Sequence, residues 1–205
     1  AGLAFALPYK ASLFNIGAQG QFYIGALTAS AVSLALGERI PALPALVLVV
    51  VAAGLAGGLW GSFIGFVKAR FNSNEFLISM MSTYVALAVM NYFLRTALME
   101  AKHEYPQTDS FAASLWLPTL FDGTRLHVGF IAAILLVIVV WVILQRTDLG
   151  YRIRVVGLNP HAARLAGVES GRIYISTFFL AGTLAGLAPA QRAVRLSPLD
   201  AIRSQ

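Results

Sequence analysis

The chain has 205 residues, of which 58% are hydrophobic and 12% charged, and its formal net charge is +6. Soluble domains are nearer half apolar and a quarter charged, so this composition argues against a soluble protein and favours one that contacts lipid. Cysteine is absent, which excludes a disulfide framework and a thiolate metal site. Basic residues of membrane proteins usually gather in cytoplasmic loops, so no nucleic-acid partner is expected.

The first seven residues are apolar but too few, and lack the preceding basic region, to indicate a signal peptide. Five later stretches lack charged side chains and can hold the roughly 20 helical residues that cross a bilayer core. They lie within residues 11–37, 40–67, 76–94, 126–145 and 173–191. Backbone amides in lipid must bond within their own segment, and these runs do not alternate as barrel strands do. The sequence therefore predicts an all-α, polytopic transmembrane bundle of about five spans.

Small residues recur every four positions in the second and fifth stretches. Such spacing lets helix backbones approach closely where lipid offers no hydrophobic drive, so we expect tight helix packing at these glycines. They are Gly54, Gly58, Gly57, Gly61, Gly65, Gly182 and Gly186. Asn74, just before the third stretch, is expected to cap that helix, with Glu75 near its positive end.

Loop charges predict how the spans are oriented. The segment 146–171 is rich in arginine, whereas the segment between the third and fourth stretches is richer in acids. The positive-inside rule places the first segment in the cytoplasm, and alternation then places Lys10, Lys68 and Arg70 there too. The basic tail, residues 189–205, falls on the outer side by this count. That conflict predicts either a re-entrant fifth stretch or a tail of separate architecture.

Within the basic segment, residues 159–167 have the signals of a short helix. Asn159 can act as the N-cap, Pro160 suits the first helical position, and Gly167 can end the helix in the left-handed conformation. About two turns of helix would be marginal in water, so the segment is expected to be held by a partner or by neighbouring spans.

Residues 147–168 resemble the cytoplasmic coupling loop of ABC permeases for ribose-type sugars, branched-chain amino acids and nucleosides. The matching positions are Gly150, Tyr151, Arg152, Val156, Gly157, Asn159, Ala162, Ala163 and Gly167. The resemblance implies that the helix 160–166 docks into a groove of an ATPase subunit. The residues implied in this coupling are Gly157, Asn159, Pro160, Ala162, Ala163, Arg164 and Gly167.

Two further segments, residues 14–26 and 58–79, are similar to nucleoside-type permeases, although Gln19 stands where that family usually has glutamate. Polar groups inside an apolar run must find partners or face water, and glycines at Gly17 and Gly20 would allow a helix break beside a ligand. One hypothesis is that polar residues border the substrate path; the other is that they bond between helices. The candidates are Asn15, Gln19, Gln21, Tyr84 and Asn91.

The resemblance implies a permease subunit of an ATP-driven importer for nucleosides or simple sugars, in a bacterial cytoplasmic membrane. Its implied partners are an ATPase subunit, a second permease subunit, an external substrate-binding protein and membrane lipid. No catalytic or metal-binding constellation appears, no cofactor is expected, and the absence of a Walker-type loop leaves ATP hydrolysis to a separate subunit. The alternative is a non-transporting scaffold whose basic loop binds lipid or a regulatory partner.

The predicted domains are a transmembrane permease domain, residues 1–188, and the basic tail. The tail is similar to the ending of lipoprotein-translocating and macrolide-exporting permeases, in which a final helix runs into a basic cytoplasmic segment. Together, the two resemblances predict a truncated, recombined or non-natural chain.

Overall fold

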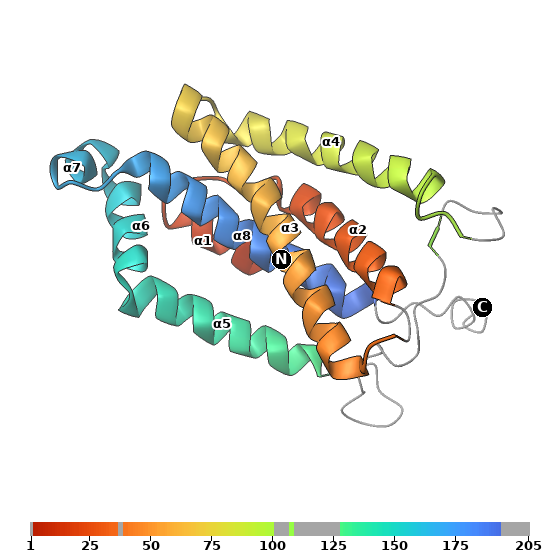
Figure 1. Ribbon diagram of the computed structural model, residues 1–205. Coiled ribbons are helices and arrows are strands. Elements are labelled where there is room, and N and C mark those ends of the chain that lie inside the picture. Colours follow the sequence, from red (N-terminus) through yellow and green to blue (C-terminus); the bar gives the residue numbers. More distant parts are fainter. Residues whose placement is uncertain (1, 37–38, 101–106, 109–127, 194–205) are drawn as a thin grey trace, which may run out of the picture.

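The computed structural model describes residues 2–36, 39–100, 107–108 and 128–193, and within these ranges the regular structure is entirely helical (Figure 1). The all-α prediction is confirmed. The helices are α1 (Gly2–Tyr9), α2 (Ala18–Leu36), α3 (Ala42–Phe71), α4 (Glu75–Arg95), α5 (Gly129–Arg146), α6 (Asp148–Leu158), α7 (Pro160–Leu165) and α8 (Ser170–Ala193).

Four of the five predicted stretches form helices long and apolar enough to cross a membrane. These are α3, α4, α5 and the Ser170–Ala188 part of α8. The first stretch forms α2, whose 19 residues extend about 28 Å and so nearly match the hydrocarbon core. Gln19 and Gln21 place two polar side chains in the first turn of α2. It lies among α3, α4 and α8, so it is an interior helix of the bundle.

The centre of the bundle is the crossing of α2, α3 and α8 (Figure 1). A Cβ atom built at Gly57 of α3 would lie 2.5 Å from the Gly182 carbonyl oxygen of α8. One built at Gly25 of α2 would lie 2.5 Å from the Gly186 Cα atom. Real Cβ atoms do not come so close to backbone, so only glycine allows these contacts. The predicted tight packing at the spaced glycines is confirmed.

Residues within the α3–α4 turn end α3 and start α4. Asn72 takes the left-handed conformation (φ 48°) after α3, and the Asn74 side chain accepts a 3.0 Å hydrogen bond from the Phe76 amide. The cap predicted for Asn74 is therefore confirmed. Lys68 forms a 3.0 Å ion pair with Glu75, so the end of α3 and the start of α4 are also joined electrostatically.

The loops predicted to share one side of the membrane do lie at one end of the bundle. The Ser12 hydroxyl, after α1, donates a 2.7 Å hydrogen bond to the Gly157 carbonyl of α6. At the end of α3, Ala69 approaches Gly171 at the start of α8. Figure 1 shows the α3–α4 turn, α6, α7 and the first turn of α8 together at this end. We call it the basic end, because Lys10, Lys68, Arg70 and the arginines of residues 146–172 belong to it.

α8 is one continuous helix of 24 residues that runs from the basic end to the opposite end (Figure 1). Its length of about 36 Å suffices to cross a membrane without turning back. The fifth stretch is therefore not re-entrant, because α8 continues through it from Ser170 to Ala193 without a turn. The expected basic tail begins within this helix, and residues 194–205 lie outside the described part.

Candidate functional site

The basic end carries a helical hairpin formed by α6 and α7. The Thr147 hydroxyl accepts a 3.2 Å hydrogen bond from the Gly150 amide and caps α6, and Asp148 in its first turn forms a 2.7 Å ion pair with Arg152. Sequence reasoning did not predict α6. The Thr147–Asp148 pair was its signal, since a capping hydroxyl followed by an acid marks a helix start.

α7 begins at the predicted cap. The Asn159 side-chain oxygen accepts hydrogen bonds from the backbone amides of His161 (3.0 Å) and Ala162 (3.1 Å), and Pro160 occupies the first turn. These bonds satisfy two amides that a helix start leaves unpaired. Because α7 has only six residues, these two hydrogen bonds are a large share of those that hold the helix.

α7 ends at the predicted glycine. Gly167 has φ +78°, its amide bonds to the Arg164 carbonyl at 3.0 Å, and the Val168 amide bonds to the Ala163 carbonyl at 2.9 Å. This pair of bonds is a Schellman motif, in which the left-handed glycine turns the chain back over the last helical carbonyls. α7 is thus a six-residue helix closed at both ends by its own sequence.

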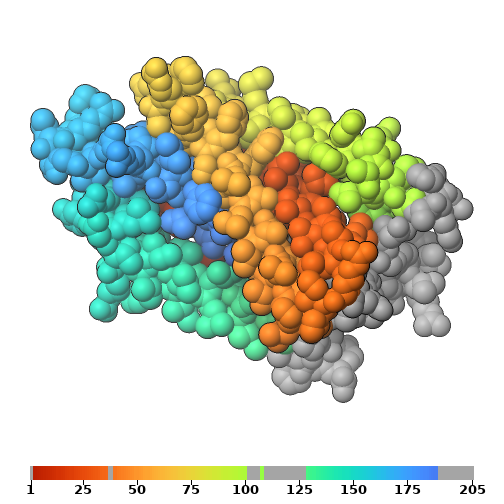
Figure 2. Space-filling model, viewed as in Figure 1, coloured from red at the N-terminus to blue at the C-terminus, as the bar shows by residue number. Residues whose placement is uncertain are grey.

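The two faces of α7 differ in exposure. Ala163 is fully buried and packs with Val156 and Ile153 of α6, whereas Leu165 is 93% exposed. Leu158, just before the cap, is 87% exposed. Figure 2 shows the α6–α7 segment projecting at one edge of the molecule. The expected coupling residues therefore divide: Ala163 anchors α7 to the bundle, and the remainder of α7 is presented outward.

The other expected coupling residues follow this division. Gly157 sits in α6 where a Cβ atom would overlap the Lys10 carbonyl oxygen, so it permits the close approach of α6 to the α1–α2 connection. The outward set is Asn159, Pro160, Ala162, Arg164 and Gly167.

Replacing Asn159 by alanine should loosen α7 without unfolding the bundle. Losing an N-cap costs about 1 kcal/mol, which corresponds to roughly fivefold faster hydrogen exchange at the His161 and Ala162 amides. Hydrogen–deuterium exchange of the peptide that contains α7 measures this. Asn159→Asp keeps the acceptor and serves as the control. Equal exchange in the alanine variant and the parent would contradict the cap.

A buried amide pair lies deeper, where the α1–α2 connection meets α2. Asn15 and Gln21 are 1% and 0% exposed, and each donates to the other, at 3.0 Å from Asn15 to Gln21 and 3.1 Å in return. The second Asn15 N–H donates to the Ala4 carbonyl at 3.1 Å. That carbonyl faces Pro8 in α1, which has no N–H to give it. Asn15 therefore supplies the bond that Pro8 cannot.

Replacing Asn15 by alanine should destabilise the fold by about 3 kcal/mol, because the Ala4 carbonyl and the Gln21 amide both lose a buried partner. Urea or dodecyl sulfate titration in mild detergent measures the change. Pro8→Ala restores an N–H for Ala4, so the cost of Asn15→Ala should be smaller in the Pro8→Ala background. An equal cost in both backgrounds would contradict the claim that Asn15 supplies the hydrogen bond that Pro8 cannot.

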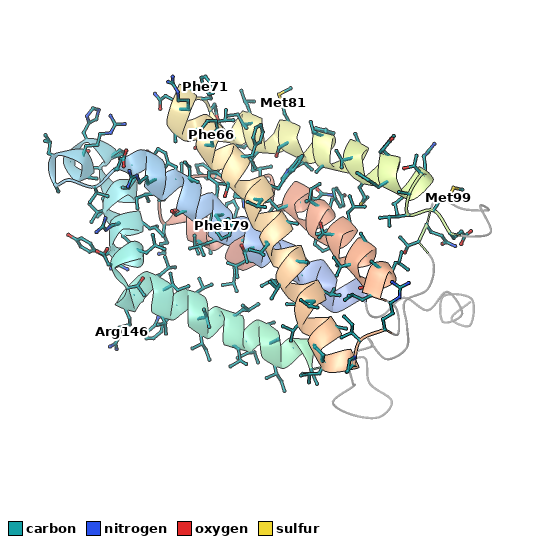
Figure 3. The ribbon with its side chains drawn as sticks, viewed as in Figure 1. Phe66, Phe71, Met81, Met99, Arg146 and Phe179 are labelled. Atoms are coloured by element: carbon teal, nitrogen blue, oxygen red, sulfur yellow. The ribbon has the colours of Figure 1, made fainter. Side chains whose placement is uncertain are left out.

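The remaining substrate-path candidates lie at the bundle surface. Gln19 is exposed and donates a 2.5 Å hydrogen bond to the Tyr23 hydroxyl, one turn further along α2. Tyr84 is 64% exposed and shares a face of α4 with Asn91, seven residues on. Met81, on the same face, points away from the bundle in Figure 3. The five candidates thus fall into a buried pair and two exposed groups, on α2 and α4.

The expected helix break at Gly20 does not occur. α2 starts at Ala18 and continues through Gly20. A Cβ atom at Gly17 would lie 2.9 Å from the Ser79 carbonyl oxygen, and one at Gly20 would lie 2.9 Å from the Thr83 Cα atom. These two glycines bring the start of α2 into contact with α4.

No group of histidine and acidic side chains suited to a metal ion occurs in residues 2–36, 39–100, 107–108 and 128–193. His161 is exposed on α7, whereas His103 and His127 lie outside these ranges.

The long apolar helices and their glycine-packed crossings define a multi-pass helical membrane protein. Comparison with known proteins makes the class specific. Residues 1–196 match the family model described as branched-chain amino acid transport system / permease component, and the chain belongs to this family. No solved structure matches it.

Three curated relatives are similar over most of the chain. The guanosine ABC transporter permease protein NupP of Bacillus subtilis is 35% identical over 92% of this chain and 54% of its own length. The glucose ABC transporter permease protein TsgB13 of Haloferax volcanii is 34% identical over 91% of this chain and 51% of its own length. The nucleoside ABC transporter permease protein NupB of Lactococcus lactis is 32% identical over 90% of this chain and 53% of its own length. The chain thus spans about half the length of these relatives.

Proposed function

We propose that this chain is the membrane-spanning part of an ATP-driven importer of nucleosides or simple sugars, and that α7 is its contact with a separate ATPase subunit. The observation that carries the proposal is the construction of α7: six residues, capped by Asn159, closed by Gly167, and presented outward at the basic end. A helix so short is unstable alone. The caps at both of its ends hold it in one conformation, which a partner can bind.

The way α7 is attached supports force transfer. Ala163 packs α7 onto α6, Ser170 at the start of α8 donates a 3.4 Å hydrogen bond to the Pro160 carbonyl, and α8 then crosses the bundle. Displacement of α7 by a partner is therefore passed to α8 and, through the glycine contacts, to α3 and α2. Packed helices move as rigid bodies, which suits alternation between inward- and outward-open states.

Nucleosides and simple sugars are the substrate classes that fit the relatives and the polar groups. The named substrates of the relatives are guanosine, glucose and nucleosides, all uncharged and rich in hydroxyl groups. Gln19, Tyr84 and Asn91 offer neutral donors and acceptors suited to such molecules. Asn15 and Gln21 bond to each other in this structure, so their part in the path requires that pair to open.

The outer face of α4 is proposed to meet a second permease subunit or water rather than lipid. Tyr84 and Asn91 lie on this face, and an amide facing lipid within a span is costly. Met81 of the same face is 70% exposed. An external substrate-binding protein and a bacterial cytoplasmic membrane complete the proposed assembly.

Uptake into vesicles tests the proposal. The full chain, reconstituted with its ATPase partner and a binding protein, should accumulate labelled guanosine or glucose only when ATP reaches the ATPase. Uptake that follows a proton or sodium gradient without ATP would refute the importer. Co-purification in detergent offers a second test, since a permease should retain an ATPase subunit and a scaffold should not.

A further inference from the structure

A pocket with two basic residues in its wall lies at the basic end, apart from the outward face of α7. It is an open pocket of about 260 Å³ between the α1–α2 connection and the last turn of α6. Gly157 allows the two segments to touch, and the Ser12 hydroxyl ties them together through its 2.7 Å bond to the Gly157 carbonyl. The lining residues are Tyr9, Lys10, Ser12, Arg154, Gly157 and Leu158.

The pocket carries two positive charges that no described acid neutralises. The ion pairs of the described residues join Lys68 to Glu75 and use Asp148 and Glu169 for Arg152 and Arg172. Lys10 and Arg154 take part in none of them. The Nη1 atom of Arg154 is buried and has no hydrogen-bond partner among the described residues. A guanidinium N–H without an acceptor is costly, and Arg154 lines the pocket, so its side chain favours an anionic ligand there.

Exposed aromatic side chains adjoin the pocket. Phe5, Tyr9 and Phe14 form a cluster with ring centroids 6.0 to 6.4 Å apart, and all three are exposed. Tyr9 belongs to both the cluster and the pocket wall. Aromatic rings are favoured at the boundary between headgroups and acyl chains, and basic pockets beside transmembrane helices hold anionic headgroups.

We propose that this pocket binds a phosphate group, with Arg154 and Lys10 as its cationic donors, and that the group belongs to an anionic phospholipid whose chains lie against the aromatic cluster. A bound headgroup would join the α1–α2 connection to α6, beside the hairpin that carries α7. This site is independent of the proposed transport function, since it requires neither an ATPase nor a substrate.

The test titrates the purified full chain in detergent with short-chain phosphatidylglycerol, short-chain phosphatidylcholine and inorganic phosphate, and follows thermal unfolding. Phosphatidylglycerol should bind and stabilise, and phosphatidylcholine should not. Lys10→Gln and Arg154→Gln should each weaken phosphatidylglycerol binding about fivefold, as expected for one basic group at a membrane surface. Arg154→Lys keeps the positive charge, so it should weaken phosphatidylglycerol binding less than Arg154→Gln does.

Arg70→Gln is the matched control, because it removes one positive charge from the same end of the bundle but not from the pocket. It should leave binding unchanged. Lys10 is exposed, so its variant reports on the site even if the Arg154 variant folds poorly. If inorganic phosphate stabilises the protein as much as phosphatidylglycerol does, the pocket is a phosphate site whose ligand is a soluble anion and not a lipid. Equal binding of both lipids, or equal weakening by Arg70→Gln, would overturn the proposal.

Discussion

Replacing Gly61 by leucine should abolish the central crossing and destabilise the protein by about 3 kcal/mol or more, the upper range for overpacking a core. A Cβ atom at this position would overlap the Phe178 carbonyl oxygen of α8 and lie 3.2 Å from the Gln21 Nε2 atom of α2. Backbone cannot move aside as a flexible side chain can. α3 would therefore have to separate from both neighbours.

The midpoint of unfolding in a dodecyl sulfate titration, with the yield of folded protein in mild detergent, measures this effect. Gly61→Ala should be intermediate, because it adds only the overlapping Cβ atom. Ala133→Leu adds similar bulk on the exposed side of α5 and should leave the midpoint unchanged. A parent-like midpoint for Gly61→Leu would contradict the α2–α3–α8 crossing.

Replacing Leu165 by aspartate should weaken ATPase binding about 30-fold and reduce ATP-driven uptake accordingly, if α7 is the proposed docking element. Leu165 is 93% exposed, so its burial must come from a partner, and a central apolar anchor contributes about 2 kcal/mol or more to an interface. The charge would also require desolvation without a counter-ion. Titration of the ATPase subunit against the reconstituted chain gives the affinity.

Leu43→Asp is the control for this change. Leu43 is 77% exposed at the start of α3, at the opposite end of the bundle, where an acid near a helix N-terminus is tolerated. It should leave ATPase binding intact. The unfolding midpoint of Leu165→Asp should match that of the parent, because Leu165 has few contacts to lose. Unimpaired binding by the folded variant would rule out α7 as the contact.

Substituting Ala163 does not test the docking directly. The family resemblance implied a coupling role for this alanine, but it is buried with residues of α6. A bulky residue there would dislodge α7 from the bundle, so loss of coupling would follow from altered packing. Substitutions at Leu165 and Ala163 therefore separate the two causes: the first changes the surface of α7 that would contact the partner, and the second changes the attachment of α7 to the bundle.

The positions of the helices were predictable because membrane spans depend on quantities that are local in the chain. The absence of charge over about 20 residues located the stretches that became α2, α3, α4, α5 and α8. The same locality made the ends of α7 predictable, since a cap at Asn159 and a left-handed Gly167 involve residues only a few positions apart. α6 was missed because its polar, basic sequence offered no hydropathy signal.

The sequence by itself determined the five long helices, the caps of α4 and α7 and the glycines that permit close approach, because each depends on a few neighbouring residues; it did not predict α1 or α6. Only the tertiary structure decided which helices meet. It placed Gly61 against Phe178, turned Ala163 inward, and brought Asn15 to the carbonyl that Pro8 leaves unpaired. These contacts join residues from different segments, and their partners are set by how the whole bundle shares its buried space, which no local spacing encodes.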